Sequence, residues 1–387
     1  MVATVLGLAI LSLSLASSAS AAAVGTPVGY GSATTGGGNA TPQTPSSNAE
    51  LADWLSDDTA RVILLDKIYD FTSEYGTEQA TACSAWTCTP NPQRILQDTC
   101  DGQSATVTIN KAGHSTNLAV GSNKTLMGKG SESGIKGIGL QLTNGVSNII
   151  IQNIRITDIN HEFVWGGDGL LISDASNVWV DHNYFNRPGR QFLTTGFGKA
   201  DGVTISNNHF DGTATYSTGC DGHHYWAMIL AGNGDKVTLL NNWFYYTAGR
   251  SPHSGGQAST DTLLYHLVNN YFSDNTGHAL DIGQGTSALA EGNYFQNVNT
   301  PIAGVEEGLA HLYFPTTVED ANPCLDALGR YCEWNRMDAS GTPATFVDSA
   351  VLGTSIGSDA AVKGITPMSV GDVPAYVQAN AGVGKVN

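Results

Sequence analysis

The middle of the chain repeats a pattern in which a short strand-forming segment is followed by asparagine and an aromatic residue. The repeat occupies residues 147–156, 176–185, 201–210, 235–244, 262–272 and 287–295. Its last five copies align one asparagine at an equivalent position: Asn183, Asn208, Asn242, Asn270 and Asn293. Irregular periods above about 20 residues, with short β-branched strands, are typical of the coils of a parallel β-helix. Asparagine at a fixed coil position can stack as a hydrogen-bonded ladder, and it tolerates the left-handed backbone of a sharp corner.

Other all-β architectures explain the repeat less well. A β-propeller needs four strands per repeat, and a sandwich gives no reason for asparagine at one recurring position. Helical patterns are restricted to residues 49–57 and 373–381, which we expect to cap the ends of the solenoid. The Gly-, Thr- and Pro-rich stretch 25–47 is predicted to lie extended on the surface. The sequence therefore predicts one all-β solenoid with short helical caps and surface loops.

The N-terminus and the charge indicate an exported protein. Residues Val5–Ala16 form an apolar run that ends in an Ala-Ser-Ala cleavage pattern, which predicts a signal peptide over 1–21 and a mature domain over 22–387. The run is too short to span a bilayer, and we expect a secreted monomer with no membrane partner. Asn39 and Asn123 begin N-glycosylation sequons. A net charge of −17 over 387 residues argues against nucleic acid as a partner.

The 6 cysteines of an exported chain predict three disulfides, for which 15 pairings exist. Cys324 and Cys332 are close in sequence and isolated from the others, and we expect them to pair locally. The other four are Cys83, Cys88, Cys100 and Cys220, so one bridge must join the first three to the distant Cys220. A metal site is the alternative interpretation, but the chain lacks the paired CxxC motifs of such sites.

Chemically informative side chains gather in four segments. These read WGGD ending at Asp168, VWVDH with RPGRQ around Arg190, CDGHHYW after residue 219, and GRSPH around Arg250. Residues about one coil apart stand side by side in a β-helix, so Asp168, Arg190 and Arg250 are expected to share one groove. Aromatic faces suit the apolar C–H faces of sugars. The walls of this groove are expected to include Trp165, Tyr225 and Trp226.

Several of these residues also have a purely structural interpretation. Arginine beside aspartate is most often a surface ion pair, and Trp179 alternates with valines as a packing residue would. The Asp181-His182 dipeptide fits a hydrogen-bonded structural pair. The two adjacent histidines at 223 and 224 suggest a metal, but neighbouring strand residues face opposite sides. We therefore predict neither a metal nor another cofactor.

The four segments together resemble the motifs of pectin lyases in the pectate lyase superfamily. VWVDH is similar to the signature strand of that superfamily, and WGGD, GRQ, CDGHHYW and GRSP occur in the family order with similar spacing. The similarity covers nearly the whole predicted mature chain. It implies a right-handed parallel β-helix and eliminative cleavage of methyl-esterified polygalacturonate. Methyl-esterified pectin is accordingly the expected partner.

Carried over residue by residue, the resemblance implies that Arg250 is catalytic and that Asp168 and Arg190 are its active-site partners. The family often has lysine three residues after the catalytic arginine, where this chain has His253. The aromatic cleft positions of the family match Trp86, Trp165, Tyr225 and Trp226. The family pattern also implies the disulfides Cys83–Cys100, Cys88–Cys220 and Cys324–Cys332.

Elimination requires removal of the acidified C5 proton of the uronate ester and departure of the glycosidic oxygen at C4. Our hypothesis makes Arg250 the base and lets Arg190 polarise the ester carbonyl. Asp168 would orient Arg190, and His253 would bind the carbonyl or the leaving group.

Three alternative functions remain to be distinguished. A calcium-dependent pectate lyase needs several carboxylates around the ion, whereas one carboxylate beside a fixed cation predicts calcium independence. A polygalacturonase needs clustered aspartates for hydrolysis. A catalytically inactive pectin-binding β-helix would not explain why Asp168, Arg190 and Arg250 occur together.

Overall fold

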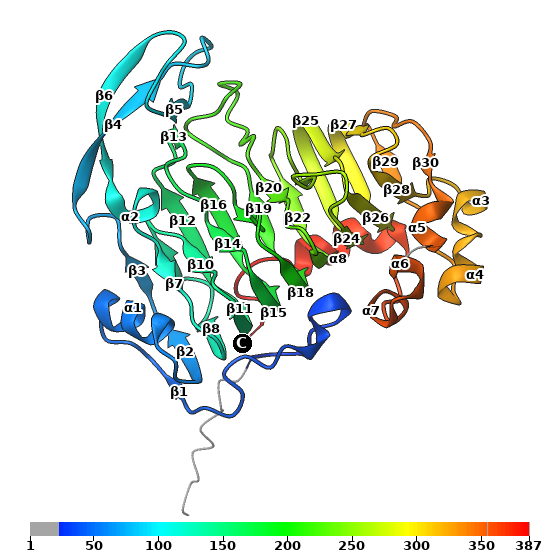
Figure 1. Ribbon diagram of the computed structural model, residues 1–387, viewed down its shortest axis with the longest axis horizontal. Coiled ribbons are helices and arrows are strands. Elements are labelled where there is room, and N and C mark those ends of the chain that lie inside the picture. Colours follow the sequence, from blue (N-terminus) through cyan, green and yellow to red (C-terminus); the bar gives the residue numbers. More distant parts are fainter. Residues whose placement is uncertain (1–22, 354, 387) are drawn as a thin grey trace, which may run out of the picture.

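The computed structural model describes residues 23–353 and 355–386, and the predicted signal peptide over 1–21 lies outside this part. Strands from successive coils pair in parallel and form long ladders along the molecule (Figure 1). The first ladder has the order β1 (Pro42–Gln43), β2 (Arg61–Leu65), β8 (Lys124–Gly128), β11 (Val146–Gln152), β15 (Ala175–Asp181), β18 (Ala200–Ser206), β21 (Lys236–Leu240), β24 (Leu263–Val268), β26 (Thr286–Glu291), β28 (His311–Phe314) and β30 (Phe346–Val347). Only its last pair, β28 with β30, is antiparallel within the described chain. The predicted parallel β-helix is confirmed.

Two further ladders complete each coil, and the long strands β25 (Tyr271–Ile282) and β27 (Tyr294–Val305) join them. The second ladder contains β3 (Ile68–Asp70), β9 (Gly134–Lys136), β12 (Arg155–Ile159), β16 (Tyr184–Pro188), β19 (His209–Asp211), β22 (Trp243–Tyr245) and β29 (Arg336–Asp338). The third contains β7 (Leu118–Ala119), β10 (Leu140–Leu142), β14 (Leu170–Ile172), β17 (Leu193–Thr194), β20 (Met228–Leu230) and β23 (His253–Ser254). Inward side chains of all three ladders form one continuous apolar core. Because strand side chains alternate, the residues between them face outward.

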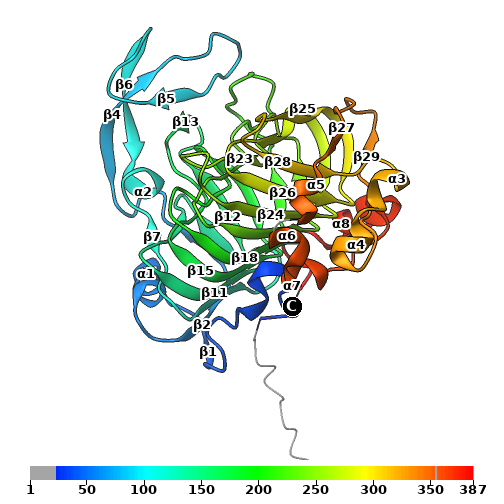
Figure 2. The same cartoon turned by 45° about the vertical axis from the view of Figure 1, so that its right-hand side comes forward.

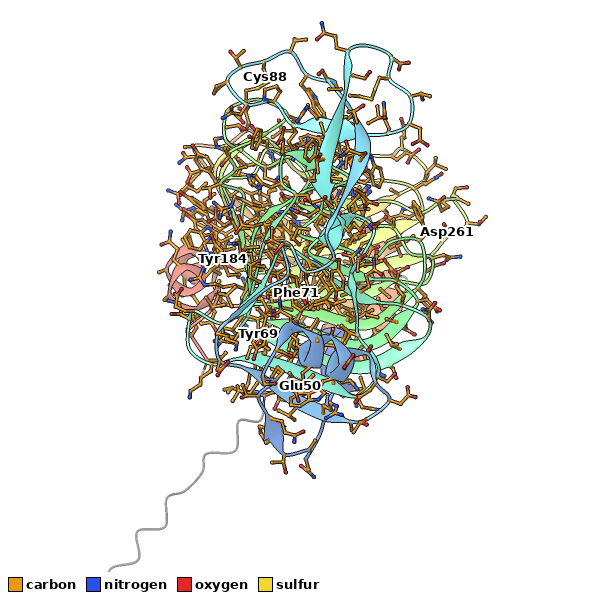
Figure 3. The ribbon with its side chains drawn as sticks, turned by 90° about the vertical axis from the view of Figure 1, so that its left-hand side faces the viewer. Glu50, Tyr69, Phe71, Cys88, Tyr184 and Asp261 are labelled. Atoms are coloured by element: carbon orange, nitrogen blue, oxygen red, sulfur yellow. A yellow bond between two sulfur atoms is a disulfide. The ribbon has the colours of Figure 1, made fainter. Side chains whose placement is uncertain are left out.

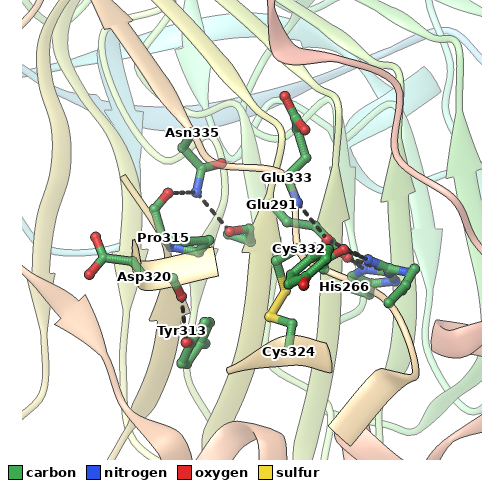
Figure 4. The surroundings of a disulfide bond; sticks show 12 residues. His266, Glu291, Tyr313, Pro315, Asp320, Cys324, Cys332, Glu333 and Asn335 are labelled. Atoms are coloured by element: carbon green, nitrogen blue, oxygen red, sulfur yellow. Dashed lines mark hydrogen bonds and ion pairs between the residues drawn. A yellow bond between two sulfur atoms is a disulfide. The ribbon is translucent and has the colours of Figure 1, made fainter. Parts of the chain in front are cut away.

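The asparagine ladder forms at the corner between the first two ladders. In each coil the backbone N–H and the side-chain Nδ2 of one asparagine both donate to Oδ1 of the next, from Asn183 through Asn293. A sixth rung, Asn335, extends the ladder and also donates to the carbonyl of Pro315 (Figure 4). The left-handed corner residue is the one before each of the five predicted rungs, for example Asn207 with φ 51°. The asparagine prediction is thus confirmed, with the strained position one residue earlier.

Phenylalanines two residues after the ladder asparagines stack inside the core. Neighbouring ring centroids from Phe185 to Phe295 lie between 4.6 and 5.1 Å apart. These stacks and the amide ladder repeat with every coil, so together they fix the register in which one coil lies on the next.

Helices cover both the end and the flanks of the solenoid. Helix α1 (Asn48–Ser56) buries Leu51 and Leu55 in the main core, as expected of a cap. The helix expected near 373–381 exists as α8 (Val373–Asn380), but it packs on the outer side chains of Tyr271 and Tyr294 rather than over an end. The remaining short helices are α2 (Lys111–His114), α3 (Val318–Ala321), α4 (Cys324–Leu328), α5 (Ser349–Gly353), α6 (Ser355–Ser358) and α7 (Ala360–Lys363), with 3-10 turns at Gly29–Ala33 and Val370–Asp372.

The N-terminal stretch 25–47 differs from the extended surface segment that we expected. It includes the 3-10 turn Gly29–Ala33 and buries Tyr30. Backbone N–H groups of Tyr30 and Gly31 donate to the hydroxyls of Thr238 and Thr204 on the outer face of the first ladder. A Cβ added at Gly31 would lie 2.7 Å from the backbone nitrogen of Thr204, so glycine permits this close approach. The outward threonines therefore act as docking points that the sequence pattern did not show.

An arm of antiparallel strands projects from the N-terminal coils (Figures 1 and 2). It contains β4 (Thr77–Cys83), β5 (Arg94–Leu96) and β6 (Ser104–Asn110), and β13 (Phe163–Val164) joins it from the solenoid. The disulfide Cys83–Cys100 lies within the arm, and Cys88–Cys220 ties the arm to a solenoid loop. Figure 3 shows Cys88 near the tip, with Tyr184 and Asp261 on opposite flanks.

The third disulfide, Cys324–Cys332, closes a loop beside a buried ionic cluster (Figure 4). Glu291 accepts hydrogen bonds from Arg330, and it also pairs with His266. Burial opposes ionisation, but these partners outweigh it and lower the pKa of Glu291. All three disulfide pairings that the resemblance implied are present.

Candidate functional site

A column of outward positions on the third ladder, which we name the floor, runs past the cavity that Asp168 and Arg190 line. Strand pairing places Gln141, Leu171, Thr194, Ile229, His253 and Asp281 in one row, one residue per coil. The first four are uncharged, and the last two form a pair with Nδ1 of His253 2.5 Å from Oδ2 of Asp281. The floor is therefore neutral along most of its length and carries charge at one end.

Asp168 and Arg190 lie side by side at the edge of this floor, as the spacing of one coil predicted. Nε and Nη2 of Arg190 donate to the two carboxylate oxygens at 3.0 and 2.7 Å. The guanidinium also lies over the ring of Trp165, 3.9 Å from its centroid. Oδ1 of Asp168 accepts a further bond from the backbone N–H of Gln191 at 2.8 Å. Arg190 is thus held in one plane by a bidentate pair and an aromatic face.

Arg250 lies two coils further along the groove. Its guanidinium carbon is 4.8 Å from the ring centroid of Trp226 and 5.7 Å from that of Tyr225. Among the residues that the structure describes, Arg250 forms no ion pair, in contrast to Arg190. A Cβ at Gly249 would lie 2.6 Å from the Tyr225 ring, so the residue before Arg250 must be small. Within the described residues the Arg250 guanidinium therefore has no carboxylate partner and lies on the rings of Tyr225 and Trp226, which we name the aromatic shelf.

Trp86 extends this shelf from the arm. Its ring meets Trp226 edge-on, with centroids 6.4 Å apart. The four predicted aromatic residues consequently divide into two groups: Trp165 lies against Arg190, whereas Tyr225 and Trp226 lie against Arg250 and Trp86 contacts Trp226. Trp165 is 52% exposed, and its backbone is in the left-handed region with φ 72°, as is that of Arg250 with φ 50°. Such strain costs on the order of 1–3 kcal/mol per residue.

The third ladder also explains the environment of His253. Asp281 is its partner in the next coil, and the hydrogen bond from His253 lowers the pKa of Asp281. His278, whose pKa is lowered by burial, accepts the backbone N–H of Arg250 at 3.2 Å. The sequence showed His253 but not these two partners, because no motif marks a residue that lies one coil away.

His224 holds the backbone of Arg190 rather than a metal. Its Nε2 lies 2.6 Å from the Arg190 carbonyl oxygen, and burial lowers its pKa to about 4. The imidazole is therefore neutral above about pH 4, with the N–H donating to this carbonyl. Within the described ranges, no group of three or more His, Cys, Asp or Glu side chains is arranged to hold a metal ion.

The environment of Asp168 shows how poorly calcium would fit the groove. A cavity of about 170 Å³ adjoins this residue, and among the described residues that line it Asp168 is the one carboxylate. Both of its oxygens already accept from Arg190. Calcium takes six to eight oxygen ligands, and a site whose sole carboxylate is neutralised by a fixed cation does not fit it.

The structural interpretations of several other motif residues are correct. Trp179 is buried and donates to the hydroxyl of Ser206, and Asp181 pairs with His182 at 2.5 Å. The sequon residues Asn39 and Asn123 are both exposed, so glycosylation there stays a prediction. No helix in the described part of the chain is long and apolar enough to cross a membrane.

Comparison with curated proteins gives full-length relatives. The chain is 46% identical to probable pectin lyase F-1 of Aspergillus terreus over 379 residues, covering 96% of this chain and 97% of the relative. It is 45% identical to probable pectin lyase F of Neosartorya fischeri and to probable pectin lyase E of Aspergillus fumigatus, with 98% of this chain and 99% of each relative covered.

Solved structures with the same fold are pectate lyases. One from Bacillus sp. N165 in complex with trigalacturonate superposes with a TM-score of 0.59 at 19% identity, covering 93% of this chain and all of that one. A Bacillus subtilis pectate lyase gives 0.58 at 17% identity, over 95% and 100% of the two chains. The family model described as pectate lyase matches residues 1–386. The chain belongs to the pectate lyase family of polysaccharide lyases.

Proposed function

We propose that this protein is a secreted pectin lyase that cleaves methyl-esterified polygalacturonate inside the chain by calcium-independent β-elimination. The observation that carries the proposal is the uncharged part of the floor beside Asp168 and Arg190, where Gln141 and Leu171 line the cavity. A free uronate needs a cation opposite its carboxylate, whereas a methyl ester needs apolar contact. This floor offers leucine and amide groups.

Charge over the whole molecule supports the same preference. The Asp168–Arg190 pair is neutral as a unit, and the protein carries a net charge of −17. A polyanion such as polygalacturonate is repelled by this long-range field. Esterified pectin is nearly neutral and experiences little of that repulsion. Our proposal also agrees with the names of the curated relatives, which are probable pectin lyases.

The proposed reaction begins with the ester carbonyl of a galacturonosyl residue near Arg190. The guanidinium, fixed by Asp168, stabilises negative charge that develops on this oxygen. Arg250 removes the C5 proton, for which its neutral form is required. The C5 electron pair forms the C4–C5 double bond as the C4–O bond breaks. The leaving oxygen takes up a proton, and a 4,5-unsaturated chain end results.

His253 is proposed to bind the polysaccharide beyond Arg250. It lies one coil from Ile229 on the floor, and its side chain is 33% exposed while it pairs with Asp281. Trp86, Trp165, Tyr225 and Trp226 supply faces for sugar rings. A floor that continues over several coils suits binding within a long chain.

Secretion is supported by the three disulfides, which persist in oxidising compartments. It also agrees with the predicted signal peptide. We further expect the mature chain to act as a monomer, which sedimentation equilibrium would test.

The decisive experiment is an ultraviolet assay for the unsaturated product on highly methylated pectin and on polygalacturonate, each with EDTA or with added Ca²⁺. We expect rapid elimination on methylated pectin in both conditions and little on polygalacturonate. Activity that is confined to polygalacturonate and requires Ca²⁺ would replace the proposal with a pectate lyase. Chain shortening without ultraviolet absorbance would indicate hydrolysis, and binding without shortening would indicate an inactive β-helix.

Arg250→Ala provides the matching test of the catalytic assignment. We expect elimination to be abolished while the far-UV circular dichroism stays that of the wild type. Near-normal turnover in this variant would remove Arg250 from the mechanism.

A further inference from the structure

A segment of the arm crosses the loops that carry the active site. Strand β5 pairs with β13 through Arg94 and Phe163, and Pro92, two residues before Arg94, bridges to Ser217. The disulfide Cys88–Cys220 joins the arm to the same solenoid loop that carries Ser217. Residues 91–96, which we name the strap, therefore contact three successive loops of the solenoid.

Gln93 lies at the centre of the strap and is 1% exposed. Its Nε2 donates to the carbonyl oxygens of His161 at 3.0 Å and of Gly189 at 3.2 Å. Its Oε1 accepts the indole N–H of Trp226 at 3.0 Å. One buried amide thus uses both donors and its acceptor on three different coils.

Each of the three partners is adjacent to a group of the proposed active site. Gly189 precedes Arg190, whose own carbonyl is bound by His224 on the next coil. The Trp226 ring is the shelf under Arg250. His161 starts the loop that leads to Trp165, the ring on which Arg190 lies. Gln93 therefore connects the supports of both arginines, although it touches neither guanidinium.

We propose that Gln93 is a positioning residue that sets the relative placement of Arg190 and Arg250. The proposal rests on the lyase function proposed above, since it assigns Gln93 a role only through those arginines. An amide suits the position because two carbonyls need donors and one indole needs an acceptor. Leucine would leave all three groups unpaired in a buried place, and glutamate would set a carboxylate oxygen against two carbonyls.

The test compares Gln93→Leu and Gln93→Glu with the control Gln79→Leu. Gln79 is in β4 of the same arm, is exposed, and donates only to Thr108. We expect Gln93→Leu to lower kcat on methylated pectin at least tenfold with a smaller change in KM, and to alter the near-UV circular dichroism of the tryptophans. Gln79→Leu should stay within twofold of the wild type.

Gln93→Glu adds a readout that a purely structural role would not change. Below the pKa of the new carboxyl group it regains one O–H donor for a carbonyl, whereas above it the charge opposes both. The ratio of variant to wild-type kcat should therefore rise as the pH falls, at constant temperature and with the protein folded. This variant also carries the test if Gln93→Leu does not fold.

Two results would overturn the proposal: a Gln93→Leu variant with kcat within twofold of the wild type, or a Gln93→Glu ratio that does not change with pH. Failure of the proposed function is recognised separately, because the wild-type protein would then produce no unsaturated product from methylated pectin. In that case the near-UV spectrum still reports whether Gln93 orients Trp226.

Discussion

Replacing Arg190 with lysine tests whether geometry, rather than charge alone, makes this residue effective. Lysine keeps the positive charge but has one ammonium in place of a planar fork. Of the two hydrogen bonds from Arg190 to Asp168, at 3.0 and 2.7 Å, only one can be kept. The contact with the Trp165 ring at 3.9 Å is lost as well. A charge-assisted hydrogen bond contributes about 1.5–3 kcal/mol and an aromatic contact of this kind about 0.5–2 kcal/mol.

In the proposed reaction these contacts orient the cation that faces the ester carbonyl, so the effect of their loss is expected mainly in the transition state. The lost hydrogen bond alone, at about 1.5–3 kcal/mol, corresponds to a decrease in kcat/KM of roughly 10- to 150-fold. The assay is formation of the unsaturated product on methylated pectin. Arg187→Lys is the matched control, because Arg187 pairs with Asp158 at 2.6 Å on the surface and its side chain is 40% exposed. We expect the control to stay within twofold. Wild-type kcat/KM in Arg190→Lys would refute the reasoning that bidentate placement matters.

Two further predictions concern stability. Asn242→Leu removes the ladder partners of the Ile205 carbonyl and the Asn208 N–H. Leaving two buried groups unpaired should lower the free energy of unfolding, measured in urea, by about 2–6 kcal/mol. A decrease below about 1 kcal/mol would contradict a structural role for the ladder. For Asp57, burial acts to raise the pKa, but hydrogen bonds from Arg61 and Lys124 outweigh it and lower the pKa to about 2. Its stabilising effect is therefore complete above about pH 4 and is lost as the pH falls through about 2. The unfolding free energy of Asp57→Asn should change less with pH in this window than that of the wild type, and parallel curves would exclude this residue as a cause.

The inward residues made the fold predictable from sequence. Asparagine and phenylalanine recur at fixed coil positions because every coil must stack on the next, and that periodicity is visible without coordinates. Asn335 escaped detection because an insertion carrying the Cys324–Cys332 loop separates it from Asn293, and because arginine follows it in place of an aromatic residue. Helix α8 was placed wrongly because its amphipathic pattern shows that one face is buried, but not against which surface.

The outward residues were predictable only where they belong to a recognisable motif. Asp168, Arg190 and Arg250 stand in recognisable segments, and the spacing of one coil brings Asp168 and Arg190 together. Gln93 and Asp281 stand in no motif. Gln93 reaches the groove through an arm whose fold depends on β13 and on the bridge Cys88–Cys220, which local sequence does not specify.

This division between inward and outward residues has a consequence for specificity. Leu171 and Thr194 project from strands whose register is set by core neighbours such as Leu170 and Leu193 and by the amide ladder. Changes to the floor residues therefore alter the folding free energy little, so these side chains can differ according to the substrate that is bound. Solved neighbours keep this fold at 17–19% identity, which shows how much of the sequence the architecture leaves free. We therefore expect that a few side chains on one ladder select the ester or the acid, while the backbone stays the same.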